Sequence, residues 1–79
     1  MNWHDHITSD KGILGGKPII KGTRLSVEFI QDRLADGWSN AQMLENFPTL
    51  RPEHIQAVHA FVKECMVDGL LFWDRRKTG

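Results

Sequence analysis

SNAQMLENFPTLRPEHI, residues 39–55, predicts two helices joined by a tight turn. Ser39 and Gln42 have the spacing of a capping box, in which two residues cap each other at a helix start. Pro48 ends that helix, and Pro52 suits the first position of the next one. The buried side of the first of these helices is expected to consist of Met43, Leu44 and Phe47. With one more helix before them they resemble a helix-turn-helix unit, although plain three-helix packing fits the same pattern.

That additional helix is predicted at about residues 27–36. Ser26 is a suitable N-cap and Gly37 a suitable C-cap. The buried face is expected to consist of Val27, Ile30 and Leu34. Phe29 falls on the opposite side, near Arg33, so we expect it to be exposed or to be a dimer contact.

The last and longest helix is predicted from Pro52 to about residue 68, with Gly69 as its stop. Its apolar face is expected to hold Ile55, Val58, Val62, Cys65 and Met66, with Cys65 as a buried, inert thiol. Its other face is expected to hold Glu53, Gln56, Ala57, Ala60, Lys63 and Glu64. His54 and His59 flank the apolar face and are expected to be packing or cap residues.

The first part of the chain predicts short strands and turns. Residues 7–8 (Ile-Thr) are expected to form a brief strand, and the apolar pairs at residues 13–14 and 19–20 are too short for helices. Gly15 and Gly16 permit positive φ, and Pro18 favours an extended residue before it. The predicted fold is therefore mainly α with short N-terminal β-strands, a three-helix helix-turn-helix domain. Residues 1–79 form a single domain, with a strand and turn arm at about 7–25, helices at 26–68 and a tail at 69–79.

A chain of 79 residues has a marginal core and needs a staple or a partner. Its single cysteine excludes an internal disulfide. A closed zinc site needs about four clustered ligands, whereas the histidines fall in two distant pairs, His4 with His6 and His54 with His59. We expect the first pair to be solvated, no metal to be bound, and the chain to form a homodimer.

Several locations and partners are disfavoured by the sequence. No apolar stretch approaches the roughly 20 residues of a membrane span, and the N-terminus lacks the pattern of a signal peptide. A single free cysteine fits a reducing compartment. The expected location is the cytoplasm, without a membrane partner.

The charges balance, with ten basic and ten acidic residues, so net charge gives no support for nucleic-acid binding. Their distribution is more informative, because two basic groups contain no acid. These groups are Lys17, Lys21 and Arg24 in the Gly-rich part, and Arg75, Arg76 and Lys77 near the C-terminus. Such a separation can give a neutral protein a local positive patch.

If the three helices form a helix-turn-helix, the last helix enters the major groove of DNA by its N-terminal end. The side chains then expected to reach bases or phosphates are Arg51, Gln56 and Lys63. Small Ala57 and Ala60 would allow close approach. Glu53 and Glu64 would repel phosphate and count against this reading.

Residues 15–24, GGKPIIKGTR, form the most distinctive segment. A nucleotide-binding P-loop needs Lys and Ser or Thr directly after its last Gly, and Gly22 is followed by Thr23 and Arg24 instead. Lys17, Lys21 and Arg24 are therefore expected to hold DNA phosphates, or to be solvated side chains of a structural turn.

Four blocks of the chain together resemble a known family, domain of unknown function 433. The blocks are residues 7–10 (ITSD), 16–27 (GKPIIKGTRLSV), 34–39 (LADGWS) and 47–55 (FPTLRPEHI). The resemblance covers roughly residues 7–65. Two positions depart from the family pattern, since Arg51 replaces the usual Ser or Thr and Lys11 replaces a Pro after Asp10.

The resemblance implies a function similar to that of VapB-type antitoxins. Such a protein has a helix-turn-helix, represses its own operator as a dimer, and neutralises a PIN-like ribonuclease toxin. The runner-up is a dimeric adaptor that does not bind DNA. A weaker third reading is an enzyme that uses the Gly-rich loop, but no paired carboxylates, catalytic triad or oxyanion loop support it, so no catalytic residue or cofactor is expected.

The C-terminal tail is expected to bind the partner protein, because an apolar run there precedes a basic one. The expected contacts are Leu70, Leu71, Phe72, Trp73 and Arg75. Aromatic and Arg side chains are enriched among interface hot spots. Alternatively, Leu71 and Phe72 pack on the core of the domain itself and leave a solvated basic tail.

Overall fold

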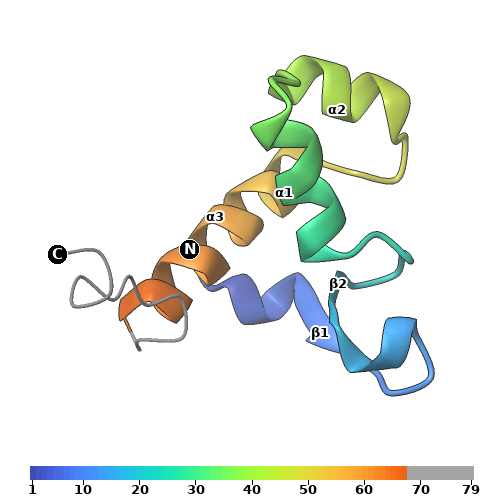
Figure 1. Ribbon diagram of the computed structural model, residues 1–79, viewed down its shortest axis with the longest axis vertical. Coiled ribbons are helices and arrows are strands. Elements are labelled where there is room, and N and C mark those ends of the chain that lie inside the picture. The colour runs from blue at the N-terminus through green and yellow to red at the C-terminus, as the bar shows by residue number, and fades with distance from the viewer. Residues whose placement is uncertain (68–79) are drawn as a thin grey trace, which may run out of the picture.

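Three α-helices and a two-stranded sheet make up the computed structural model, which describes residues 1–67 (Figure 1). The elements in chain order are the 3₁₀-helix η1 (Trp3–Asp5), strand β1 (Ile7–Ser9), the 3₁₀-helix η2 (Leu14–Gly16), strand β2 (Pro18–Ile20), and the helices α1 (Val27–Ala35), α2 (Asn40–Asn46) and α3 (Pro52–Val67). The mainly helical fold with short N-terminal strands is confirmed, with strands at the expected positions 7–8 and 19–20. The apolar pair at residues 13–14 is in neither strand, because Leu14 begins the turn of η2 that joins them. The predicted helix stop at Gly69 and the tail residues Leu70, Leu71, Phe72, Trp73 and Arg75 lie outside the described residues.

The two strands pair antiparallel, with Ile7 opposite Ile20. Their connection turns through Gly15 and Gly16, at φ 66° and 89°, in the left-handed region that glycine adopts at little cost. Ile7 and Ile20 are buried, and Ile19 forms an isolated bridge to Ser26 at the start of α1. The hairpin is thereby attached to the first α-helix.

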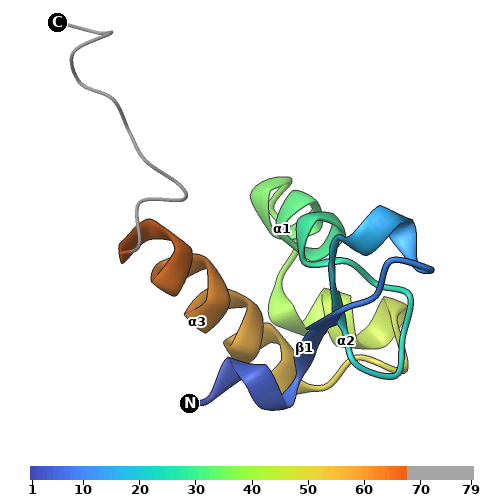
Figure 2. The ribbon, with the colours of Figure 1, turned by 90° about the horizontal axis from the view of Figure 1, so that it is seen from below.

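The core lies where α3 meets the other elements. α3 packs against η1, β1, α1 and α2, and Figure 2 shows η1 and β1 on one side of it. The buried cluster consists of Ile7, Ile20, Val27, Ile30, Met43, Leu50, Ile55, Ala57 and Val58. A core this small is consistent with the marginal stability expected of a short chain.

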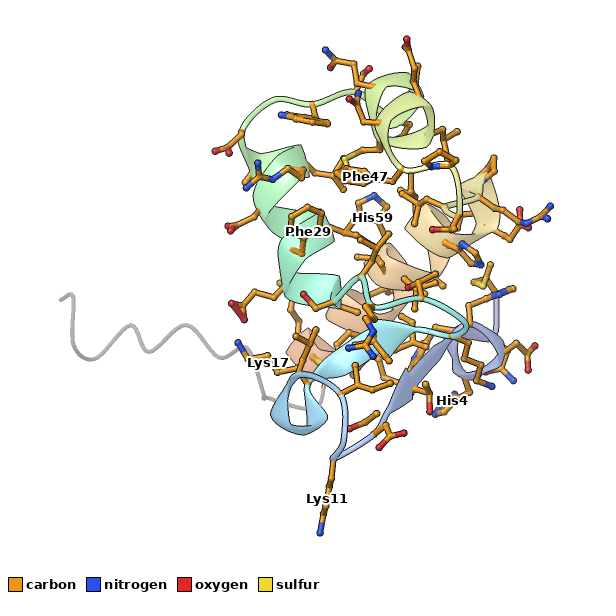
Figure 3. The ribbon with its side chains drawn as sticks, turned by 90° about the vertical axis from the view of Figure 1, so that its right-hand side faces the viewer. His4, Lys11, Lys17, Phe29, Phe47 and His59 are labelled. Atoms are coloured by element: carbon orange, nitrogen blue, oxygen red, sulfur yellow. The ribbon has the colours of Figure 1, made fainter. Side chains whose placement is uncertain are left out.

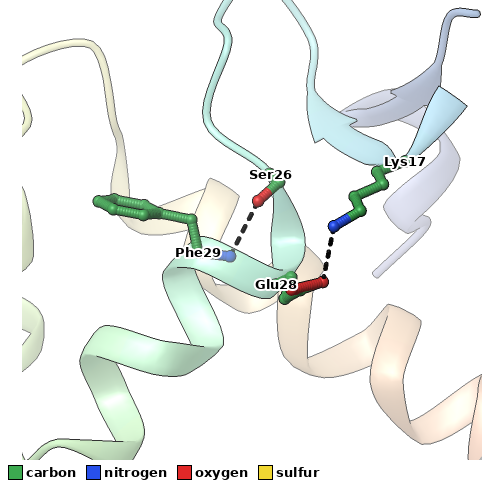
Figure 4. Close-up of polar contacts among 4 residues, drawn as sticks. All are labelled: Lys17, Ser26, Glu28 and Phe29. Atoms are coloured by element: carbon green, nitrogen blue, oxygen red, sulfur yellow. Dashed lines mark hydrogen bonds and ion pairs between the residues drawn. The ribbon is translucent and has the colours of Figure 1, made fainter. Parts of the chain in front are cut away.

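The predicted helix starts are confirmed. The Ser26 hydroxyl accepts a hydrogen bond from the Phe29 N–H at 2.9 Å, as Figure 4 shows. Ser39 and Gln42 form a complete capping box, with bonds of 2.8 and 3.1 Å. Gly37 has φ 95° directly after the last residues of α1, which suits a helix end.

Phe29 is not exposed, so that prediction is wrong. It is half-buried, and its ring meets that of Phe47 edge to face at 5.3 Å (Figure 3). The Arg33 guanidinium lies 5.1 Å from the Phe29 ring centroid and 5.9 Å from that of Trp38. α1 therefore has a second packed face, which contacts residues on either side of α2. The single apolar stripe of the α1 sequence does not predict this face.

The apolar face predicted for α3 is correct for most positions and wrong at one. Ile55 and Val58 are buried, and Val62 and Cys65 are half-buried. Met66 is 60% exposed, because the last turn of α3 extends past the described elements that cover its beginning.

Candidate nucleic-acid interface

One side of α3 carries exposed polar side chains. Gln56, His59 and Lys63 are exposed and are spaced three and four residues apart, so they form one stripe along the helix, here called the α3 stripe. Gln56 and Lys63 are two turns apart, about 10.5 Å along the helix axis. The structure thus brings two of the predicted DNA contacts onto the same solvent-facing side.

The two alanines predicted to face DNA are not on the α3 stripe. Ala57 is fully buried, so its prediction is wrong. It lies one turn from both His54 and Phe61, on the side of α3 that η1 and β1 cover. Ala60 is half-buried and lines a hollow together with Trp3. A small residue at position 57 therefore makes room for the N-terminal segment and not for DNA.

The acidic residues of α3 lie at the two ends of the stripe. The Glu64 carboxylate accepts a hydrogen bond from the indole Nε1–H of Trp3. Glu53 is half-buried near the start of the helix. Glu53 precedes Gln56 by one turn and lies about 60° from it on a helical wheel, and Glu64 lies about 80° from it. No carboxylate therefore lies between Gln56 and Lys63.

The beginning of α3 is capped by a histidine. The Arg51 N–H donates to Nδ1 of His54 at 3.0 Å, which confirms the predicted cap role of His54. Arg51 itself is exposed next to the first turn. His59 is exposed, and its expected packing or cap role stays a prediction.

The pKa of the His54 ring is lowered from its ordinary value of 6.5. Burial is the main cause, since a half-buried ring loses solvation when it becomes charged. Positive charge at His6 and Arg51 acts in the same direction, and the Glu53 carboxylate opposes it. The structure therefore favours the neutral ring, whose Nδ1 accepts a hydrogen bond.

The basic residues of the Gly-rich segment are in different situations. Lys17 forms an ion pair with Glu28 at 3.3 Å, shown in Figure 4, between two exposed side chains. The Lys21 side chain is exposed, and the Lys21 backbone N–H donates to the backbone carbonyl of His6 at 2.8 Å. Arg24 is exposed beside a hollow that Asp10 also lines. No described contact joins Lys17 or Arg24 to the α3 stripe.

Lys21 and Arg51 are brought to the same end of the molecule by two histidines. The rings of His6 and His54 lie 5.5 Å apart between centroids. The first ring follows η1, beside the Lys21 backbone, and the second caps the helix that follows Arg51. The Lys21 backbone is thus linked to the start of α3 through the contact between these two rings.

The sequence reasoning missed the N-terminal segment. His6 was expected to be solvated, and that is wrong, because it is half-buried against His54. His4 is exposed, as expected, and stacks on Trp3 at 3.7 Å. The sequence signal that this segment packs on the domain was a large aromatic residue, Trp3, directly after Asn2, which caps η1.

Within residues 1–67 there is no group of three or more His, Cys, Asp or Glu side chains that could hold a metal ion. Cys65 is half-buried and is not in a disulfide. None of the helices in this part of the chain is both long and apolar enough to cross a bilayer.

The sequence matches the model of the family described as "Protein of unknown function (DUF433)" over residues 7–62. The chain belongs to this family. The DUF433 match runs from β1 through most of α3, so it includes Lys17, Lys21, Arg24, Arg51 and Gln56. It leaves out Trp3 and Lys63.

The chain is also similar to the uncharacterized protein y4eO of Sinorhizobium fredii (strain NBRC 101917 / NGR234). The two are 37% identical over 57 residues, which is 72% of this chain and 26% of that protein. The chain thus spans about a quarter of that relative's length. No solved structure matches the chain.

Proposed function

We propose that this chain is a cytoplasmic, antitoxin-like DNA-binding protein, which acts by binding and not by catalysis. The observation that carries the proposal is the α3 stripe: a helix held by four other elements turns Gln56 and Lys63 outward, without a carboxylate between them. A rigidly supported helix with an exposed polar side is what a DNA major groove, about 12 Å wide, accommodates.

The residues of the α3 stripe suit two kinds of DNA contact. The Gln56 amide matches the donor and acceptor pair of adenine, so it would read sequence. Lys63 is a long cation that would reach a guanine edge or a phosphate. Arg51, at the N-terminal end of α3, would contact a phosphate or a guanine as the helix enters the groove.

The hairpin would add phosphate contacts, which position a protein without reading sequence. Lys21 and Arg24 are exposed, so both cations can contact a phosphate directly. Lys17 must first leave Glu28. We therefore assign most of this contribution to Lys21 and Arg24.

The remaining parts of the proposal rest on the family resemblance. A helix-turn-helix dimer would repress its own operator, and the C-terminal tail would bind a PIN-like ribonuclease toxin. Homodimerisation is also supported by the small core.

One observation favours the adaptor as a second candidate. Residues 1–67 contain seven basic and eight acidic side chains, so they provide no overall attraction to DNA. In the same part of the chain, Arg33 packs with Phe29 and Trp38 in a cluster of the residue types that are enriched at protein interfaces.

Fluorescence anisotropy with the DNA upstream of the protein's own gene tests the proposal. We expect tighter binding to this duplex than to a shuffled one, and a loss of affinity between roughly 50 and 200 mM salt. Gln56→Ala should remove about 1–3 kcal/mol of the discrimination between the two duplexes. Lys21→Gln should weaken binding to both duplexes and lower the salt slope by about one.

Lys11→Gln is the matched control, because it removes one exposed cation at the tip of the hairpin, away from the helices (Figure 3). It should leave both duplexes bound as by the natural chain. Absence of salt-dependent binding to the upstream DNA, with or without a partner protein, would favour the adaptor instead.

A further inference from the structure

The starts of α2 and α3 are capped in the same way by different chemical groups. In α2 the Ser39 N–H donates to the amide oxygen of Gln42 at 2.8 Å. In α3 the Arg51 N–H donates to the imidazole Nδ1 of His54 at 3.0 Å. Both acceptors stand at the third position of their helix, where a capping box normally has Glu or Gln. An amide accepts a hydrogen bond at any ordinary pH, whereas an imidazole nitrogen accepts only when it is unprotonated.

The cap of α3 lacks the reciprocal half that α2 has. Position 51 carries Arg in place of the Ser or Thr whose hydroxyl would accept from the first turn. At this helix start, the half of a capping box that the structure shows is therefore the hydrogen bond from the Arg51 N–H to the His54 side chain. Loss of that acceptor leaves the Arg51 N–H without the partner that the structure gives it.

His54 also lies between α3 and the N-terminal segment. Its ring meets the His6 ring at 5.5 Å, with an interplanar angle of 69°. The carbonyl of His6 accepts from the Lys21 N–H at the end of the hairpin. The charged and titratable groups that face His54 are His6 from the N-terminal segment and Arg51 and Glu53 from its own helix end.

We propose that His54 is a pH-sensitive cap of α3, which holds the first turn to the N-terminal segment when neutral and releases it when protonated. A proton taken from solvent onto Nδ1 turns the acceptor into a second donor that faces the Arg51 N–H. The new positive charge lies at the N-terminal end of a helix, where the macrodipole disfavours cations, and beside Arg51 and His6. The inference does not depend on DNA binding.

The direction of the pH dependence follows from the lowered pKa of His54. The unfolded chain binds this proton more readily than the folded chain does, so acid favours unfolding. The stabilising contribution is complete above pH 6.5, the ordinary value, and is lost as pH falls through the folded-state pKa. Below that value the contribution does not change further.

An NMR titration of the full chain tests the cap directly. We expect the His54 ring to titrate below 6.5 and the backbone amide of Arg51 to shift with the same midpoint. The four histidine rings are assigned from single His→Gln variants. An Arg51 amide whose chemical shift does not follow the His54 titration overturns the proposal. This titration is followed on the natural chain, in which the cap is intact.

A second experiment replaces the acceptor. His54→Gln puts the normal capping-box residue at this position, so the acceptor remains while the titration is removed. The urea midpoint of the natural chain should fall between about pH 7.5 and about pH 5.5, and most of that fall should be absent in this variant. His59→Gln is the control, since it removes an exposed histidine of the same helix, and it should keep the fall. A His54→Gln chain with the full pH dependence of the natural chain refutes the cap.

Discussion

The indole of Trp3 meets the ring of Phe61 edge to face, with 4.8 Å between centroids and an interplanar angle of 85°. This pair joins the first turn of the chain to the middle of α3. Trp3 lies before the segment that matches the DUF433 family, which begins at residue 7. In this chain, the N-terminal segment therefore contributes to the packing of α3, the helix that we propose binds DNA.

Trp3→Ala should destabilise the domain. Aromatic pairs of this geometry contribute about 0.5–1.5 kcal/mol, and a half-buried Trp also loses apolar contact, so we expect a total loss of about 1–3 kcal/mol in the free energy of unfolding. Urea denaturation followed by circular dichroism measures it. Lys11→Ala, at an exposed position, should change the value by less than about 0.5 kcal/mol. Equal midpoints for the two variants would contradict the role given to η1.

Ser26→Ala should cost about 1–2 kcal/mol of stability, the upper part of the range for an N-cap. The hydroxyl caps α1, and Ser26 is the buried polar residue of the described chain, so its loss leaves the Phe29 N–H without its partner. Thr49→Ala, at an exposed site in the α2–α3 connection, is the control. A loss no larger than that of Thr49→Ala would show that solvent replaces the cap.

The helix starts were predictable because caps are local. Ser26 and the pair Ser39 and Gln42 act within one turn of their own helix, so sequence spacing is sufficient to identify them. Proline at position 52 likewise marks the first residue of α3 without reference to the rest of the molecule.

The errors concern contacts between distant segments. Ala57 was assigned to solvent because the apolar period of α3 shows only the face toward α1, whereas η1 and β1 cover a second side. Phe29 was assigned to solvent for the same reason, since Phe47 comes from the end of α2. Periodicity describes one face of an element, so a helix with two packed faces is only partly predicted by it.

Replacement of His6 should raise the pKa of His54 in the folded chain. Positive charge at His6 is one of the causes that lower this pKa, so His6→Gln should bring it closer to 6.5 and flatten the dependence of stability on pH below that value. The His54 ring titration, followed by NMR, measures the shift. His4→Gln, at an exposed position, should leave the midpoint where it is. An unchanged midpoint in His6→Gln would mean that His6 does not contribute and that burial, Arg51 and Glu53 determine the pKa of His54.

Glu28→Gln tests the ion pair of the hairpin with α1. Lys17 and Glu28 are 58% and 69% exposed, so their pair should contribute less than about 1 kcal/mol to stability. If the hairpin contacts DNA, the freed Lys17 should strengthen binding to both the upstream and the shuffled duplex and increase the salt slope by about one. Asp32→Gln, which removes an exposed carboxylate one turn later, is the control for the change in net charge. Equal effects of the two variants would mean that Lys17 has no specific role.

A chain shortened after Gly69 should fold and still lose its partner. The buried side chains of the described residues lie between Ile7 and Val58, so the truncation leaves all of them in place. If the tail binds the PIN-like toxin, the shortened chain keeps its circular dichroism spectrum and its sedimentation as a dimer but no longer co-purifies with the toxin. Phe72→Ala and Trp73→Ala in the full chain should weaken the toxin complex without changing the dimer, because aromatic side chains dominate interface energy. Unfolding of the shortened chain, or its dissociation to monomers, would instead assign the tail to the core or the dimer interface and reject its role as a toxin-binding segment.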